Sequence, residues 1–238
     1  MNILVVNDDS ISAPGIAMLA KAAAELGDVW VVAPAQQCSA MSQKLTLRES
    51  LHVKKVEDFP VNVKAAWQVS GTPVDCVKVA LNHILDHKPD YVLSGINNGY
   101  NVGFDIAYSG TLGAAFEAVR SGIPAMAFSA AGDSHLQALE PCLLPVIREL
   151  LETELEQGKV WNVNFPPMKT RPLMGILHER TAATVSMFTE RYVETVQPDG
   201  SKVLTIQGIP TADSELAEGS DAEAVRKGYI SIGKVSAF

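Results

Sequence analysis

The N-terminal part of the chain alternates between short aliphatic runs and a helical pattern, and this alternation constrains the fold most. Residues 2–6 are nearly all aliphatic, which is typical of a parallel strand buried on both faces. Apolar residues then recur at helical spacing over residues 16–26, and residues 29–32 form the next apolar run. A strand, a helix and a strand in this order predict a right-handed βαβ unit and therefore a parallel sheet.

The same alternation continues along the rest of the chain. Further helices are expected at residues 74–85, 112–119, 136–151 and 222–225, and further strands within residues 45–69 and at residues 91–93, 125–128, 160–163 and 229–232. A length of 238 residues suits one α/β unit, and no linker or repeat interrupts the pattern. We therefore predict a single domain over residues 1–238.

A long hairpin is expected near the end of this domain. Residues 185–196 and 202–206 read as two strands around the turn signal Pro198-Asp199-Gly200. A β-hairpin of this length, at about residues 185–207, is expected to project from the body and to pack on a partner subunit.

The bulk composition excludes several kinds of partner and location. The formal net charge of −8 repels polyanions, so we expect neither a nucleic acid polymer nor an anionic membrane as a partner. No apolar segment reaches the roughly 18 residues of a membrane span, and the N-terminus lacks the basic region of a signal peptide. The three cysteines are widely spaced and odd in number, which favours a reducing environment. These features predict a cytoplasmic protein.

Polar residues gather where three of the expected strands end. The first strand ends at Asn7, Asp8 and Asp9, the second runs into residues 35–42, and another runs into residues 94–99. In an open parallel sheet these loops share the edge at which ligands bind. Carboxylate, hydroxyl and amide oxygens suit Mg²⁺, Mn²⁺ or Ca²⁺ rather than zinc. The alternative is that the two aspartates only begin a turn, but their position at this edge favours a metal site.

A second polar group stands before the helix expected at residues 112–119. Hydroxyl groups and unpaired backbone N–H groups at a helix N-terminus attract anions such as phosphate. Ser109, Gly110 and Thr111 provide such a group, although a simple helix cap is the alternative interpretation. A metal site at the same edge favours phosphate. The chain has neither the dinucleotide-binding glycine motif nor the ATP-binding phosphate loop.

Several ordered motifs resemble one known family. The motifs are Asn7-Asp8-Asp9, Ala13-Pro14-Gly15, Ala33-Pro34 with Ser39 and Ser42, Gly71-Thr72-Pro73, Ser94-Gly95-Ile96-Asn97 and Tyr108-Ser109-Gly110-Thr111, with weaker matches at Gly219-Ser220-Asp221 and residues 228–232. Together they resemble the SurE family (survival protein E), which comprises metal-dependent phosphatases of nucleoside monophosphates. The resemblance implies a Rossmann-like three-layer α/β fold with a mostly parallel sheet, and a homodimer or homotetramer that exchanges C-terminal elements.

The resemblance also implies a site and a reaction. One divalent cation, Mg²⁺ or Mn²⁺, is expected on Asp8, Asp9, Ser39 and Asn97. The two aspartates are the expected catalytic residues for hydrolysis of nucleoside 5′-monophosphates, with 3′-monophosphates and short polyphosphate as further candidates. The residues expected to contact substrate or phosphate are Asn7, Ser42, Asn98, Asn101, Ser109, Gly110 and Thr111.

Some positions depart from the family pattern. Ser10 follows the acidic pair where glycine is usual, residues 35–38 are uncharged where relatives carry charges, and Ala40 replaces a common glycine. These departures leave the expected metal ligands intact and concern substrate preference.

Two other function classes are compatible with an acidic pair at the end of a first strand. A signalling receiver domain also binds Mg²⁺ there, but it needs an acceptor aspartate after the third strand, where this chain has Ser94, Asn97 and Asn98. A nucleotide-binding sensor without turnover would use the same residues as the enzyme, so only an assay separates these two.

Overall fold

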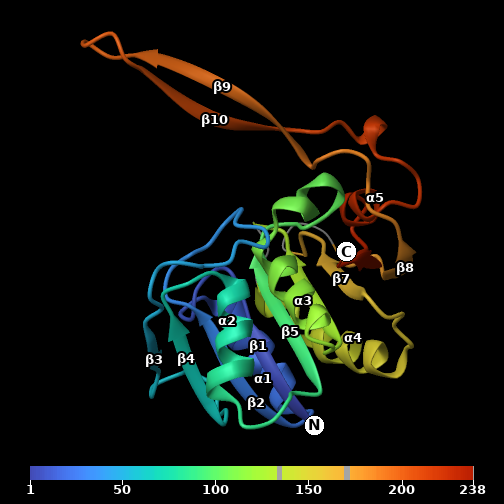
Figure 1. Ribbon diagram of the computed structural model, residues 1–238. Helices are drawn as coiled ribbons and strands as arrows, with labels where there is room; N and C mark the ends of the chain where they lie inside the picture. The colour runs from blue at the N-terminus through green and yellow to red at the C-terminus, as the bar shows by residue number, and fades with distance from the viewer. Residues whose placement is uncertain (133–135, 169–171, 238) are drawn as a thin grey trace.

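The protein is described by a computed structural model covering residues 1–132, 136–168 and 172–237. Figure 1 shows one α/β body from which a long hairpin projects. The strands of the body are β1 (Asn2–Val6), β2 (Asp28–Pro34), β3 (Val53–Lys55), β4 (Ala65–Val69), β5 (Tyr91–Asn98), β6 (Ala125–Ala130), β7 (Lys159–Phe165), β8 (Ile176–Arg180) and β11 (Ile230–Ser236). The α-helices are α1 (Pro14–Ala24), α2 (Pro73–Val79), α3 (Gly110–Arg120), α4 (Glu140–Glu152) and α5 (Asp221–Arg226). Short helical turns are the π-helix η1 (Ala80–Ile84) and the 3₁₀ helices η2 (Gly103–Tyr108), η3 (Leu136–Ala138) and η4 (Asp213–Glu215).

The main sheet has nine strands in the order β3-β4-β2-β1-β5-β6-β7-β11-β8. Strands β4, β2, β1, β5, β6 and β7 run parallel to one another. The antiparallel pairings are at the sides, between β3 and β4 and between β11 and β7. The prediction of a mostly parallel α/β sheet is therefore confirmed.

Two helical layers cover the sheet because its central strands are apolar on both faces. In β1, Ile3 and Val5 belong to the core on the side of α1 and α4, whereas Leu4 and Val6 belong to the core on the side of α2 and α3. This alternation follows from the period of two in a strand. It produces the three layers and fixes the ends of β1, β2 and β5 at one edge.

The structure corrects some predicted boundaries. The helix expected at 74–85 is α-helical only to Val79 and continues as the π-helix η1, in which the Leu85 N–H donates to the Ala80 carbonyl. Strand β8 was not predicted, because its residues are partly exposed and mixed in polarity and give no clear alternation. The helix expected at 136–151 is split into η3 and α4.

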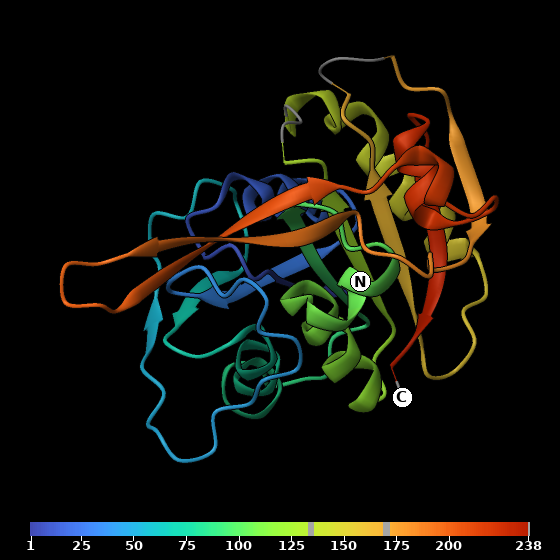
Figure 2. The ribbon, with the colours of Figure 1, turned by 90° about the horizontal axis from the view of Figure 1, so that it is seen from above.

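The hairpin consists of β9 (Phe188–Val196) and β10 (Lys202–Pro210), which form a separate two-stranded antiparallel sheet. The inner ends of the two strands, Val196 and Lys202, coincide with the prediction, whereas the outer ends lie at Phe188 and Pro210 instead of residues 185 and 206. The hairpin rises from the carboxyl edge of the body in Figure 1, and it crosses above the N-terminal half of the sheet when seen from above in Figure 2.

Candidate functional site

The loops that follow β1, β2 and β5 meet at the carboxyl edge of the sheet, as predicted. The backbone N–H of Cys38 donates to the carbonyl of Asp8 at 2.7 Å, which places Ser39 beside the acidic pair. The backbone N–H of Asn98 donates to Oδ2 of Asp9 at 2.9 Å, which places Asn97 on the other side. The four predicted metal ligands therefore come from the loops after β1 and β2 and from the end of β5, and hydrogen bonds join the first loop to the other two segments.

Asp8 is buried against the start of α3. Its exposed fraction is 5%, and its Oδ1 accepts a 2.7 Å hydrogen bond from the Thr111 hydroxyl. Burial raises the pKa of Asp8 to about 6; the neighbouring charge of Asp9 adds to this rise, and the bond from Thr111 opposes it. A side-chain carbon at Gly110 would lie 3.0 Å from Cβ of Asp8, so a larger residue there would press on Asp8.

Asp9 is more accessible and is held by two donors. Asn98 donates to Oδ2, and Nε2 of Gln37 donates to Oδ1 at 3.2 Å. Sequence reasoning missed Gln37, because no spacing rule relates an exposed residue of one loop to a carboxylate of another.

The N-terminus of α3 points at Asp8. Ser109 is the N-cap residue, and its Oγ accepts from the Leu112 N–H at 3.0 Å. The capping interpretation is therefore correct for Ser109, while Thr111 uses its hydroxyl on Asp8 instead. Since the first backbone N–H groups of a helix lack intrahelical partners, this end of α3 faces the acidic pair with its positive dipole.

The loop that carries Ser39 and Ser42 is held against η2 and α3. Ser42 donates its N–H to the Tyr108 carbonyl and its hydroxyl to the Ala107 carbonyl, both at 2.9 Å. Its backbone has a φ of 51°, and a side-chain carbon at Gly113 would lie 2.1 Å from its carbonyl oxygen. Ser39 is exposed, and it lies next to the acidic pair through the Cys38 contact.

Two of the predicted substrate contacts lie below the surface. Asn7 is fully buried; its Nδ2 donates to the Ser10 carbonyl at 2.8 Å, while its Oδ1 has no partner. Asn101 is 5% exposed, and it takes part in a network with Ser129, Asn162 and Asn164 through its backbone and its Nδ2. These bonds give Asn101 a supporting position under the edge of the sheet.

A second buried carboxylate supports the site from the C-terminal part of the chain. Asp221 accepts the backbone N–H groups of Gly103 at 3.0 Å, Ala183 at 2.9 Å and Ala222 at 2.7 Å. Burial raises its pKa, and the three donors oppose this rise. Asp105 in turn accepts the Met187 N–H at 3.1 Å. The turn η2 is thereby tied to the root of the hairpin.

The donor set fits a hard divalent cation. Among residues 1–132, 136–168 and 172–237 no three His, Cys, Asp or Glu side chains cluster to hold a metal, so a cation at this edge depends on hydroxyl and amide oxygens as well. Within the same ranges, no ion pair joins Asp8 or Asp9 to a basic side chain. Two adjacent carboxylates, two further oxygens and no compensating cation agree with an Mg²⁺ or Mn²⁺ site.

Comparison with known proteins decides the family. Residues 3–213 match the family model of "Survival protein SurE". The chain belongs to the SurE family. Relatives include the 5′-nucleotidase SurE of Synechococcus sp. (strain JA-3-3Ab), 40% identical over 98% of this chain and 90% of the relative, and the 5′/3′-nucleotidase SurE of Shigella dysenteriae serotype 1, 37% identical over 98% and 88%. The predicted family is therefore confirmed.

The SurE fold is also confirmed by a solved structure. The crystal structure of the SurE protein from Aquifex aeolicus superposes with a TM-score of 0.84 at 33% identity, covering all of this chain and 94% of that one. In the described part of the chain, no helix is both long and apolar enough to cross a membrane.

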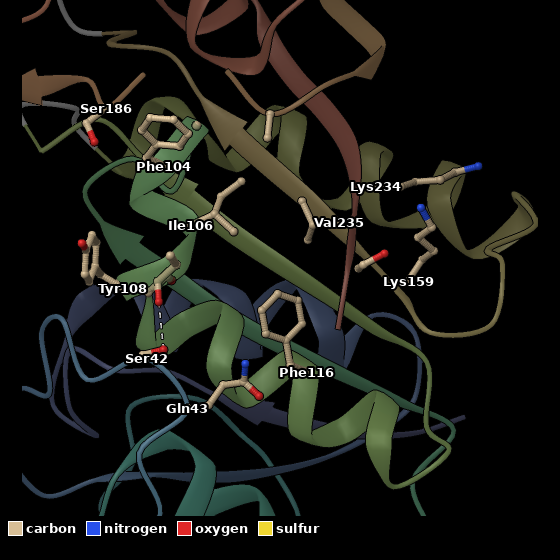
Figure 3. Close-up of a pocket in the computed structure, with 15 residues that line it drawn as sticks. Ser42, Gln43, Phe104, Ile106, Tyr108, Phe116, Lys159, Ser186, Lys234 and Val235 are labelled. Carbon is tan, nitrogen blue, oxygen red and sulfur yellow. Dashed lines mark hydrogen bonds between the residues drawn. The ribbon is translucent and has the colours of Figure 1, made fainter. Parts of the chain in front are cut away.

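Two cavities adjoin the loops around Asp8 and Asp9. One, of about 820 Å³, touches Ser42 and Ser109 and then extends along α3. Figure 3 shows Ile106, Phe116 and Val235 lining it, with Lys159 and Lys234 at the end away from Ser42. The other, of about 560 Å³, begins at Gly99 and extends toward the hairpin. Neither cavity is lined by Asp8 or Asp9.

Proposed function

We propose that the protein hydrolyses nucleoside 5′-monophosphates to a nucleoside and phosphate. The observation that carries this proposal is the acidic pair at the carboxyl edge, facing the N-terminus of α3 in a chain of the SurE family. The relatives from Synechococcus and Shigella are named 5′-nucleotidase and 5′/3′-nucleotidase. Nucleoside 3′-monophosphates and short polyphosphate are proposed as further substrates.

The proposed cofactor is one divalent cation, Mg²⁺ or Mn²⁺, on Asp8, Asp9, Ser39 and Asn97. A cation held there supplies positive charge against the phosphate and makes water more acidic. The two carboxylates, which pair with no basic side chain in the described part of the chain, and the oxygen ligands that all four side chains offer support this assignment.

The chain itself supplies the phosphate site. Gly110 leaves space beside Asp8, and the N-terminus of α3, whose Leu112 N–H is capped by Ser109, directs the positive end of its helix dipole toward that space. The Thr111 hydroxyl holds Asp8 in one orientation, and the Asn98 N–H does the same for Asp9. Either aspartate lies where it can accept a proton from an attacking water. The Ser42 contacts with η2 close the loop that carries Ser39 over this space.

The test is phosphate release from a panel of nucleoside 5′- and 3′-monophosphates after chelation and after addition of Mg²⁺ or Mn²⁺. We expect no release after chelation and full release with metal. Asp8→Asn should lower the turnover at least about 10³-fold without unfolding the protein, because it removes a ligand charge. A fully active Asp8→Asn variant would refute the mechanism, and binding of nucleotide without release would favour a sensor.

We also propose an assembly and a location. The exposed apolar side chains of the hairpin support packing on a second copy, as a homodimer or homotetramer. All three cysteines are free thiols, which supports a reducing, cytoplasmic environment. Sedimentation of the purified protein tests the first proposal.

A further inference from the structure

The cavity of about 560 Å³ is a groove that begins at Gly99, just after β5, and extends to the root of the hairpin at Met187 and Phe188. Its first residue, Gly99, accepts a hydrogen bond from Nδ2 of Asn97 at 2.9 Å. A side-chain carbon at Gly132, which also lines the groove, would lie 4.0 Å from Oδ1 of Asn98. The groove therefore starts directly at the loop that bears a proposed metal ligand.

The groove lies across the carboxyl edge of the sheet. Gly99, Ala131 and Pro167 line it just after the ends of β5, β6 and β7. The larger cavity runs the other way: it reaches Lys159 and Ser236, which pair at the start of β7, toward the amino edge. Ligands of open parallel sheets bind beyond the carboxyl ends of the strands, which favours the groove at Gly99 for the rest of the substrate.

The lining of the groove suits an uncharged, flat group. It is formed by apolar and aromatic side chains, namely Tyr100, Met187, Phe188 and Val225. Among the described residues that line it, Arg226 is the one basic side chain. Its Nε lies 3.3 Å from Oδ1 of Asp213, and its Nη2 donates to the Thr211 carbonyl. The larger cavity instead ends at two lysines.

Phe188 is the aromatic ring best placed to stack on such a group. It is 51% exposed although it lies at the root of the hairpin, where Thr211 and Asp105 hold the neighbouring Met187 by hydrogen bonds. A side-chain carbon at Gly208 would lie 3.5 Å from Cδ1 of Phe188, so the ring packs over the bare backbone of that residue. An anchored ring with an open face is a stacking platform.

We propose that this groove is the nucleoside subsite and that Phe188 stacks on the base. The proposal rests on the proposed nucleotidase function and adds to it the part of the protein that recognises the nucleoside. Because stacking on one ring does not distinguish the bases, the subsite accepts purine and pyrimidine nucleotides alike. The root of the hairpin is then part of the substrate site.

The experiment compares Phe188→Ala with Phe104→Ala and Tyr192→Ala on two substrates, AMP and ribose 5-phosphate, which lacks a base. Phe104 is an equally exposed ring in the larger cavity, and Tyr192 is an exposed ring on the same face of the hairpin, outside both cavities. For Phe188→Ala we expect KM for AMP to rise about 5- to 20-fold, with kcat and the hydrolysis of ribose 5-phosphate unchanged. Phe188→Leu should give an intermediate rise, and Tyr192→Ala none.

Three results would overturn the subsite: an unchanged KM for AMP in Phe188→Ala, an equal loss with both substrates, or a base-dependent loss in Phe104→Ala only. Calorimetric titration of the same proteins with AMP and ribose 5-phosphate separates this proposal from the proposed function. If the wild-type protein shows no turnover but binds AMP more tightly than Phe188→Ala does, the proposed hydrolase activity is refuted and the subsite stands. Equal AMP affinity in both proteins would refute the subsite.

Discussion

The carboxyl edge of the sheet and the hairpin both hold side chains in environments that do not match their polarity, but in opposite senses. At the edge, the carboxylate of Asp8 is buried and fixed by Thr111. On the hairpin, Tyr192, Leu204 and Ile206 are each more than half exposed. The antiparallel register places these three side chains on one face together with Phe188 and Val196, where they are interspersed with Glu190, Glu194 and Lys202; we call this the apolar face for its exposed large side chains. Each region is thus unfavourable for an isolated monomer, in one case by a buried charge and in the other by exposed apolar surface.

The difference shows what each region needs to become stable. Under the proposals made above, a bound cation would neutralise the charge at the edge, and a second copy of the chain would cover the apolar side chains of the hairpin. Substitutions at the edge should therefore change the free energy of unfolding and the metal affinity, whereas substitutions on the apolar face should change the oligomeric mass. The following predictions test this separation.

The largest effect on stability is expected for Asp8→Asn in metal-free protein. The pKa of Asp8 is 3.8 in the unfolded chain and about 6 in the folded protein. The folded state thus binds the proton more tightly, and stability is lost as the pH rises from below 4 to above 6, by about 3 kcal/mol. At pH 8, Asp8→Asn should be more stable than wild type by about 2 to 3 kcal/mol in urea unfolding with chelator. At pH 4 this gain should disappear.

Asp199, in the turn of the hairpin, provides the matched control. Hydrogen bonds from Ser201 lower its pKa, so its charge favours the folded state. Asp199→Asn should therefore cause a much smaller change in the opposite direction. A stability gain of Asp8→Asn that is equal at pH 4 and pH 8 would show that burial of charge is not its cause.

The next largest effect is expected for Thr111→Val. This change removes the donor to Oδ1 of Asp8 while preserving the shape of the side chain. Loss of a hydrogen bond that orients a metal ligand typically costs about 10- to 100-fold in metal affinity, and we expect this loss for Mn²⁺ in calorimetry. Thr111→Ser retains the hydroxyl and should bind Mn²⁺ nearly as wild type does. If the valine variant matched wild type, Asp8 would be oriented by other contacts.

On the hairpin, the double change Tyr192→Glu and Ile206→Glu should alter assembly rather than stability. These residues face each other across β9 and β10. Two charges on the apolar face should yield a smaller species in sedimentation, while the unfolding free energy of the body changes by less than about 0.5 kcal/mol. Thr205→Glu, on the opposite face, should leave the assembly intact. Unchanged mass of the double variant would exclude this face as the contact between subunits.

The smallest effect is expected for Gln37→Ala. Gln37 is exposed, and its 3.2 Å bond to Asp9 competes with water. The metal concentration needed for half-maximal AMP hydrolysis should rise only about two- to threefold. Gln37→Glu, which adds a negative charge beside Asp9, should instead lower that concentration or slow product release. A tenfold or greater effect of the alanine would mean that Gln37 contacts the substrate.

The sequence could predict the sheet and the position of the acidic pair because both follow from local rules. Strand β1 is aliphatic on both faces, and the parallel neighbours of such a strand end at the same edge. The start of α3 was predictable as well, since Ser109 precedes a helical pattern. The individual roles at the site stay predictions that the assays above address.

Other features depend on contacts between residues far apart in the chain, and no local pattern encodes them. Strand β8 is defined by its pairing with β11 and not by its own polarity. The motif Gly219-Ser220-Asp221 was visible in the sequence, but the donors of Asp221 lie at residues 103 and 183. The buried position of Asn101 likewise depends on partners in β6 and β7.

The bonds of Asp221 have a consequence for how the protein is made. The backbone of η2, which leads into the phosphate end of α3, is held at Gly103 by a carboxylate that is synthesised 118 residues later. A nascent chain can pair β1, β2 and β5 early, but the loop beside its site gains this support only when the last helix emerges. Contacts of such long sequence separation slow folding, so the catalytic edge is expected to be completed among the last events after synthesis.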